Sequence, residues 1–281
     1  MRLAPVVLCI SLLLRAGRAP AQGTCTPPTD SHEAQMFAAY SVPLAYAFGE
    51  ASGALRPGEV HLMLEVTYLP EIAEDIRTPT ICRPGKGSEN THFLSAYPRP
   101  RVAIGLPSRF RLEASWIPPV RLNEVESNLV GLSVDRSFPV GAGGAELVVR
   151  GHGTFGVISA PITCDDEDLA DPSSECFQGT KSDDHYHPNI FGVEAIYSWP
   201  LGRVRPFMGA GANILHPRLQ VNFTNSAGST DSTRVAVNMT RGALLAGATW
   251  AATGGFGLTG EIYSSPGDAV TGRVVASYRL P

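Results

Sequence analysis

Apolar and polar residues alternate with a period of two along most of the chain after residue 57. In residues 59–69, even-numbered positions are apolar and odd-numbered positions are mostly polar. Successive side chains of a β-strand point to opposite faces, so this pattern indicates a strand with one apolar and one polar face. The pattern recurs in about ten segments and predicts an all-β fold. The segments are 58–69, 100–106, 109–121, 127–138, 145–157, 189–199, 203–216, 233–250, 254–264 and 269–280.

One of these segments, 233–250, changes its alternation part of the way along. Its apolar residues occupy odd positions up to Met239 and even positions from Leu244 onward. A β-bulge adds one residue to a strand and moves the following side chains to the other face. We therefore expect a bulge near Arg241-Gly242.

The connections between the expected strands alternate in length. Four are tight (107–108, 141–144, 201–202 and 254–255), two are long and polar (70–99 and 158–188), and two are intermediate (122–126 and 224–232). A transmembrane barrel has short periplasmic turns and longer external loops. A soluble secreted β-sandwich, the main alternative fold, has no reason for this alternation. We predict a closed antiparallel transmembrane β-barrel over residues 58–281, with an even number of strands, about ten within a range of about eight to twelve.

The two faces of the expected strands have different roles in such a barrel. The apolar face meets lipid and the polar face lines the lumen, since only a closed sheet leaves no unpaired edge in hydrocarbon. The charges expected in the lumen include Glu59, Glu65, Arg109, Arg111, Glu113, Glu146, Arg150, Glu194 and Arg273. A barrel of this size is nearly filled by side chains, and opposite charges in it should pair. A packed, salt-bridged interior is favoured over a narrow polar path.

Aromatic residues lie mostly near the ends of the expected strands. They are Tyr40, Tyr46, Tyr68, Trp116, Tyr197, Trp199, Trp250 and Tyr263. Girdles of aromatic residues at both membrane interfaces are typical of transmembrane barrels. We expect these residues to form such girdles.

The N-terminus has the three-part layout of a secretory signal. Arg2 precedes an apolar core at 6–14, and Ala19-Pro20-Ala21 reads as a cleavage site within residues 1–23. The apolar run ends at Arg15, short of the roughly 20 residues that a membrane-spanning helix needs. Removing three arginines and no acid lowers the formal charge from −4 to −7. An acidic chain with so few lysines argues against a nucleic-acid partner.

Four cysteines remain beyond residue 23, and an even number in an exported chain indicates two disulfides. Cys164 and Cys176 flank one polar loop and are expected to pair, which leaves Cys25 with Cys82. A zinc site is less favoured, because the chain has no paired C-x-x-C motif.

Residues 24–57 are small, apolar and interrupted, and they do not fit the strand pattern. A disulfide from Cys25 to an external loop would require this segment to reach the outer side. The direct route is through the lumen, as a plug. An extra edge strand and a loose periplasmic tail are the alternatives.

The C-terminal region resembles a known group of proteins. Residues 205–212, R-P-F-M-G-A-G-A, resemble a strand common in small bacterial outer-membrane barrels; 247–250 with 258–263 is similar to the next hairpin, and 274–280 to the terminal strand. The resemblance implies the cell outer membrane, with lipid and lipopolysaccharide around the barrel and the barrel assembly machinery as a partner. Such barrels usually end in an aromatic residue that this machinery reads. This chain ends in Leu280-Pro281, which indicates a divergent signal or a different barrel type.

The loop at 165–184 carries the densest acidic cluster of the chain. Its oxygen ligands could hold Ca²⁺, but the ordered spacing of a calcium loop is missing, so a solvated acidic loop is favoured. Asp184-His185 resembles the Asp–His pair of omptin-type proteases, in which the acid orients a general base. Such enzymes need a second acidic pair, whereas Asp75 and Glu124 are single.

These observations rank three functions. A barrel with a structural or interaction role comes first, a narrow passive channel or carrier for small solutes second, and a barrel enzyme third. We expect no catalytic residues, no metal and no cofactor.

Overall fold

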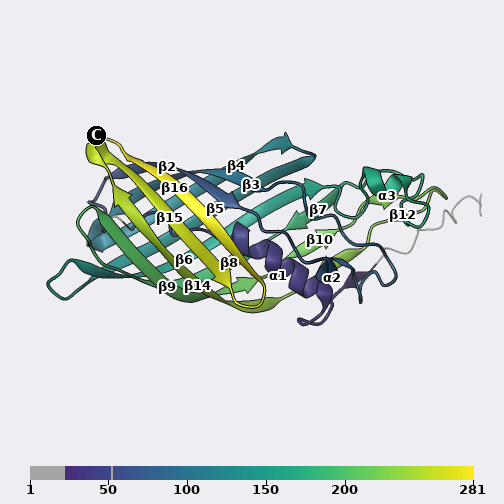
Figure 1. Cartoon of the computed structure of the whole chain (residues 1–281), viewed down its shortest axis with the longest axis horizontal. Helices are drawn as coiled ribbons and strands as arrows, with labels where there is room; N and C mark the ends of the chain where they lie inside the picture. The colour runs from purple at the N-terminus through teal and green to yellow at the C-terminus, as the bar shows by residue number, and fades with distance from the viewer. Residues whose placement is uncertain (1–22, 52) are drawn as a thin grey trace, which may run out of the picture.

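The computed structural model describes residues 23–51 and 53–281, so the expected signal segment lies outside the described residues except for Gly23. The chain forms a closed ring of ten antiparallel strands (Figure 1). The strands are β2 (Val60–Tyr68), β3 (Ala96–Leu106), β4 (Phe110–Leu122), β5 (Val125–Val140), β6 (Ala145–Ala160), β8 (Ile190–Ser198), β9 (Val204–Leu215), β14 (Met239–Ala251), β15 (Phe256–Ser265) and β16 (Ala269–Arg279). Pairing of β6 with β8 and of β16 with β2 closes the ring. The predicted antiparallel barrel is confirmed.

Short strands extend the sheet beyond the ring at one end. Residues 146–154 of β6 pair with β8, whereas its last residues, Ile158–Ala160, pair with β7. The sheet therefore branches at β6. The added strands are β7 (Asp184–His187), β10 (Arg218–Gln220), β13 (Arg234–Ala236) and β1 (Thr24–Cys25), with a separate pair of β11 (Phe223–Thr224) and β12 (Thr230–Asp231). Strand β13 lies within the expected segment 233–250. Sequence alternation did not indicate the other short strands, because each has too few residues to show a period.

The helices are short. They are α1 (His32–Leu44), α2 (Glu74–Arg77) and α3 (Asp166–Ala170), with 3-10 turns η1 (Pro107–Arg109) and η2 (Thr253–Gly255). No helix among the described residues is long and apolar enough to cross a membrane.

The two ends of the barrel differ in their connections. One end carries the four tight turns and the C-terminus, and the opposite end carries the long loops, α3 and the added strands (Figure 1). Short turns mark the periplasmic side of such barrels, so the added strands are external. The connection expected at 122–126 is a tight turn, with positive φ at Asn123 and Glu124. Consecutive positive φ angles suit a two-residue hairpin, so an external connection is not always long.

The expected bulge near Arg241 is wrong. β14 pairs with β9 along its length without a register shift. Val235 and Met239 point inward and are buried, while Leu244 and Trp250 point outward at the alternate parity. The apolar residues change parity because β13 belongs to the external extension, whose inner side is an apolar core, while β14 faces lipid outside.

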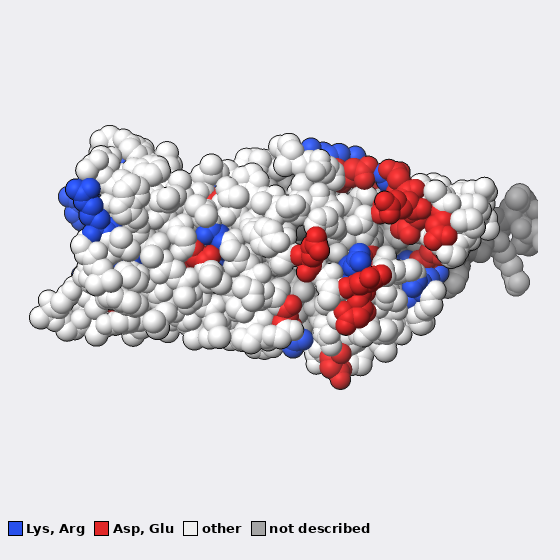
Figure 2. Space-filling model, in the orientation of Figure 1, with Lys and Arg blue, Asp and Glu red and all other residues white. Residues whose placement is uncertain are grey.

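The outer wall of the barrel is apolar. Its exposed large side chains include Leu62, Leu64, Val66, Leu112, Val130, Leu132, Val134, Val193, Ile262 and Val274. Figure 2 shows a middle stretch almost free of charged residues and a gathering of acidic residues toward the external end. Soluble proteins rarely expose an apolar surface this continuous. The belt is therefore the lipid-facing surface.

The aromatic girdles are formed by only some of the expected residues. Tyr68 and Trp116 are exposed toward the external side, and Tyr197 and Trp250 toward the periplasmic side, where Trp199 stacks on Tyr197. The assignment is wrong for three others, Tyr40, Tyr46 and Tyr263. Tyr263 points inward from β15, and Tyr40 and Tyr46 lie on the segment inside the barrel.

Candidate functional site in the barrel lumen

The N-terminal segment lies inside the barrel. Ser31 caps the start of helix α1, where its hydroxyl accepts the N–H of Ala34, and the helix contacts β15 and β16. After Leu44 the chain is extended, and Ala45, Tyr46 and Ala47 are 0% exposed. An extended segment without a strand partner must satisfy its backbone groups by other contacts. Side chains of the barrel wall supply them.

Arginines of the wall bind the carbonyl oxygens of this interior segment. They project from β3, β4, β6 and β16, so they reach the segment from several sides. The bonds are Arg273 Nη2 to Val42 O (2.8 Å), Arg99 Nη2 to Leu44 O (3.0 Å), Arg150 Nη2 to Tyr46 O (2.8 Å), Arg101 Nη2 to Ala47 O (3.0 Å) and Arg111 Nη1 to Glu50 O (3.0 Å). A guanidinium has several donors in a fixed fork and can bind more than one partner.

Most of these arginines also pair with buried carboxylates of the wall. The ion pairs are Arg111 Nε–Asp135 (2.9 Å), Arg150 Nε–Glu194 (3.0 Å), Arg273 Nη1–Glu261 (2.9 Å) and Arg101 Nη1–Glu65 (2.5 Å), with Glu113 as a second partner of Arg101. An unpaired buried charge costs several kcal/mol. Each of these four guanidinium groups therefore joins the wall to the interior backbone while its charge stays compensated.

Wall acceptors bind the N–H groups of the same segment. Glu261 accepts the N–H of Phe48 (3.1 Å), and the Thr249 hydroxyl accepts that of Ala51 (2.9 Å). Gly49 has φ +62°, and a Cβ there would lie 2.7 Å from Arg101 Nη2. The small residues that interrupted the sequence pattern are thus what allows the wall to approach the backbone.

The expected lumen charges mostly reach the interior. Those that are buried there are Glu65, Arg111, Glu113, Glu146, Arg150, Glu194 and Arg273. Glu59 lies near the periplasmic rim and binds Arg56 and His61. The expected lumen position of Arg109 is corrected. Its side chain is 43% exposed in the turn η1, and it contacts Glu146 from the periplasmic rim. Strand β4 begins one residue later, at Phe110, so Arg109 does not share the face of Arg111.

Sequence reasoning missed Arg99, which is 1% exposed. The expected strand began at residue 100, whereas β3 begins at Ala96. The parity of Arg99 relative to Arg101 was the signal that could have found it.

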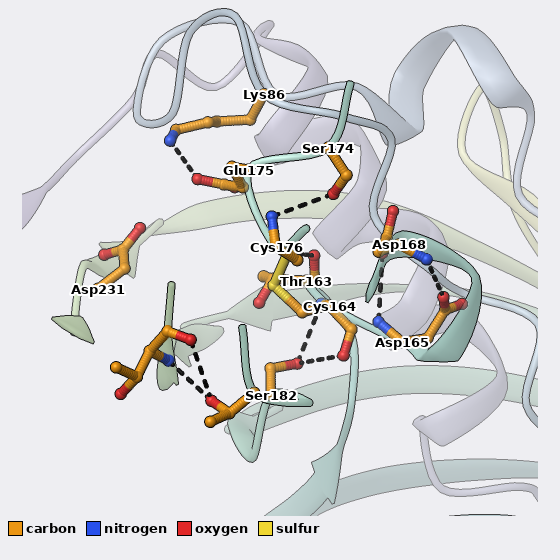
Figure 3. The surroundings of a disulfide bond; sticks show 12 residues. Lys86, Thr163, Cys164, Asp165, Asp168, Ser174, Glu175, Cys176, Ser182 and Asp231 are labelled. Atoms are coloured by element: carbon orange, nitrogen blue, oxygen red, sulfur yellow. Dashed lines mark hydrogen bonds and ion pairs between the residues drawn. A yellow bond between two sulfur atoms is a disulfide. The ribbon is translucent and has the colours of Figure 1, made fainter. Parts of the chain in front are cut away.

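The external loops are fastened to one another. Disulfides join Cys25 to Cys82 and Cys164 to Cys176, the pairing expected above. Arg83 pairs with Glu89, Glu175 and Asp231, so its one side chain connects loops 69–95, 161–189 and 216–238. The pairs are Arg83–Glu89, Arg83–Glu175 and Arg83 Nε–Asp231 (3.6 Å). Figure 3 shows Glu175 beside Cys176, with Lys86 as a further partner.

Glu33 fastens the start of α1 to the same loops. Its carboxylate accepts the backbone N–H groups of Thr80 (2.9 Å), Ile81 (2.7 Å) and Cys82 (2.9 Å). Burial raises the pKa of Glu33, but the hydrogen bonds from Cys82 and Ile81 outweigh burial and leave this pKa below its ordinary value.

The acidic loop uses its carboxylates for local contacts. Asp165 and Asp168 form a capping box on α3, visible in Figure 3, and Asp166 pairs with Lys181. Within residues 23–51 and 53–281, no group of three or more His, Cys, Asp and Glu side chains could hold a metal ion.

The Asp–His pair suggested by the sequence is not formed. Asp184 accepts the backbone N–H groups of Thr163 (2.7 Å) and Asn222 (2.8 Å), whereas His185 Nδ1 contacts the carbonyl of Asp183 (2.9 Å). Asp184 is therefore a structural acceptor that joins two external loops.

No protein-family model and no curated protein sequence matches the chain. Among solved structures, the chain is similar to the attachment invasion locus protein Ail of Yersinia pestis (11% identity, 80% of this chain and 100% of that chain, TM-score 0.32). It is also similar to Neisserial surface protein A (12%, 79% and 96%, TM-score 0.26) and to the toluene transporter TodX of P. putida (13%, 81% and 68%, TM-score 0.31). The closed ring of strand pairs and the continuous apolar belt are the features of a membrane-spanning β-barrel. The chain is a β-barrel of the outer-membrane type, and its location is the cell outer membrane.

Proposed function

We propose that this protein is a non-conducting outer-membrane barrel with a structural or interaction role, in which residues 24–57 plug the lumen. The observation that carries the proposal is the set of arginine bonds to the backbone of residues 42–50. Wall and segment share their buried charges and hydrogen bonds, so withdrawing the segment would leave several charges without backbone partners. Outer-membrane lipid and lipopolysaccharide surround the barrel, and the barrel assembly machinery inserts it.

The external end supports an interaction role. Two disulfides and the contacts of Arg83 fix three loops into one surface. Binding by a fixed surface avoids much of the entropy cost of ordering loops. We propose that this surface, not the lumen, meets other molecules, and that the protein has no catalytic activity.

A narrow passive channel is the second candidate. At the periplasmic end, a cavity of about 10 Å³ lies between Phe48, Glu50 and Arg111. A cavity of this size holds about one water. A solute path would therefore require the interior segment to move.

Planar-bilayer recording of the oxidised protein tests the proposal. We expect no steady conductance from the native protein. Replacing Tyr46 and Phe48 by alanine removes the largest side chains of the extended segment and should produce small, steady currents. The matched control replaces Tyr68 and Trp116 by alanine, which are lipid-facing aromatics, and should stay silent. Native currents like those of an open porin would reject the plug.

A further inference from the structure

The barrel wall parts along one seam. Pairing between β3 and β4 stops at Arg101 opposite Ser115, although both strands continue toward the external side. There β3 stays paired with β2 as far as Ala96, and β4 stays paired with β5 as far as Leu122. The stretches 96–100 and 116–122 therefore form two facing edges without pairing between them in the described strands.

Prolines line the β3 edge of this seam. The N–H of Gly105 donates to Glu59 O (2.9 Å), and its carbonyl accepts from Gly58 (2.9 Å), so odd-numbered residues of β3 direct their backbone polar groups toward β2. Even-numbered residues direct theirs toward β4. Pro98 and Pro100 occupy even positions, where a missing N–H leaves no orphan donor.

The β4 edge carries a matching proline. Leu112 and Ala114 of β4 lie opposite even-numbered residues of β3, so even-numbered residues of β4 direct their backbone polar groups toward β3. Pro118 is also an even position of β4. Strand β4 shifts register against β5 between Ile117 and Val120. A backbone N–H left unpaired in hydrocarbon costs several kcal/mol. Prolines on both edges keep the seam from pairing and lower the cost of leaving it open.

The seam lies within the lipid-facing belt. Pro100 is opposite Leu64 and Pro98 is opposite Val66. Leu64 is 49% exposed and Val66 is 43% exposed on the outer wall. The external girdle residue Tyr68 lies beyond them along β2. The opening is therefore at the depth of the acyl chains of the outer leaflet.

A cavity of about 460 Å³ lies behind the seam. Its outer side includes Leu64, Pro98 and Pro100, and its inner side includes Tyr40 and Leu44 of α1. Its lining contains no Asp, Glu, Lys or Arg, and its histidine, His92, is an exposed residue. The volume is within the usual range for small-molecule sites, about 300–1,000 Å³. A charged ligand would lose hydration there without gaining a charged partner.

We propose that this cavity binds an acyl chain of an outer-leaflet lipid, which enters sideways through the seam between β3 and β4. The lipid headgroup remains at the interface, so the uncharged lining meets hydrocarbon alone. Helix α1 forms the inner wall of the cavity and separates the acyl chain from the ionic part of the lumen. The inner wall belongs to residues 24–57, so the site rests on the proposed place of this segment inside the barrel, but it does not depend on whether the barrel conducts.

Quenching by lipids with brominated acyl chains tests the proposal. In a background with Trp116, Trp199 and Trp250 changed to Phe, Tyr40→Trp places one reporter on the inner wall of the cavity. Reconstituted in vesicles of brominated phosphatidylcholine, this reporter should lose most of its emission relative to unbrominated vesicles. Tyr46→Trp in the same background is the matched control and should keep its emission, because it lies in the filled lumen. Phe93→Trp gives a second reporter in the cavity lining.

The remaining arms separate the outcomes. Adding Ala39→Leu to Tyr40→Trp narrows the cavity and should restore the emission. Folding is checked for each variant by its shift in electrophoretic mobility on heating. Folded Tyr40→Trp and Phe93→Trp proteins that both resist quenching would overturn the site. Quenching by a brominated free fatty acid but not by brominated phospholipid would overturn the lipid as its source.

Discussion

The interior of the barrel has an ionic part and an apolar part, and the interior segment passes through both. Around residues 45–51 the wall presents arginines and carboxylates, whereas around α1 it presents the apolar cavity. The difference follows the backbone of the segment. A helix satisfies most of its own N–H and C=O groups, so its surroundings can be apolar. An extended segment satisfies few of its own, so the wall must supply donors and acceptors.

The end of α1 marks the transition. The last carbonyls of a helix lack internal partners. Here the carbonyls of Val42, Pro43 and Leu44 accept from Arg273, Tyr97 and Arg99, respectively, at 2.7–3.0 Å. The polarity of a barrel wall can therefore be determined by the secondary structure of the segment that fills it.

The largest effect is expected from the ionic part. Arg150→Met removes the guanidinium partner of the buried Glu194 carboxylate, which keeps only the His152 imidazole (3.3 Å), and it should lower the free energy of unfolding by about 3–5 kcal/mol. Urea titration of the reconstituted protein measures this. Adding Glu194→Leu should recover most of the loss. Arg136→Met, an exposed position on β5, is the control. Equal stability of the Arg150 and Arg136 variants would contradict the ionic anchoring.

The second-largest effect is expected from the Cys25–Cys82 disulfide, which fastens the segment that carries α1 to an external loop. Replacing Cys25 and Cys82 by serine opens a loop with a sequence separation of 57 residues. The chain-entropy model gives a loss of up to about 4 kcal/mol. Amide exchange should increase in α1 and stay slow at 45–51, where the arginines still hold the backbone. Serine at Cys164 and Cys176 is the control. Equal acceleration in both parts would show that the two anchorages are not separate.

A smaller effect tests the fit of the extended segment. A Cβ at Gly131 of β5 would lie 2.5 Å from the ring of Tyr46. Gly131→Ala should therefore cost about 1–3 kcal/mol through overpacking. Gly260→Ala, on an outward position with nothing within 4 Å, is the matched control. An unaffected Gly131 variant would mean that Tyr46 does not occupy this place.

The smallest effect concerns pH. Hydrogen bonds from Cys82 and Ile81 lower the pKa of Glu33 against the opposing effect of burial. A lowered folded-state pKa stabilises the protein above the unfolded value, and this stability is lost as the pH falls through the folded pKa. Glu33→Gln should cost about 1 kcal/mol at pH 7 and progressively less in acid. A cost independent of pH, measured by urea titration, would refute this assignment.

The alternation of residues determined the main features of this protein. Because side chains of a strand alternate by geometry alone, the sequence of β2 (Val60–Tyr68) predicted both its faces, and the number of alternating segments predicted about ten strands. The same local rule placed Glu65 and Arg150 inside. It could not place Arg99 or Arg109, since the former follows a proline and the latter lies in a turn.

Tertiary structure alone decided how the interior is filled and where the wall opens. Residues 45–51 have no period, and their course depends on arginines that three distant strands bring to them. The prolines at 98, 100 and 118 carry no periodic signal of their own in the sequence. Their common orientation toward one seam depends on strand register, which fixes the side of each backbone N–H. Register is set by pairing across the whole sheet, so a single strand's sequence does not contain it.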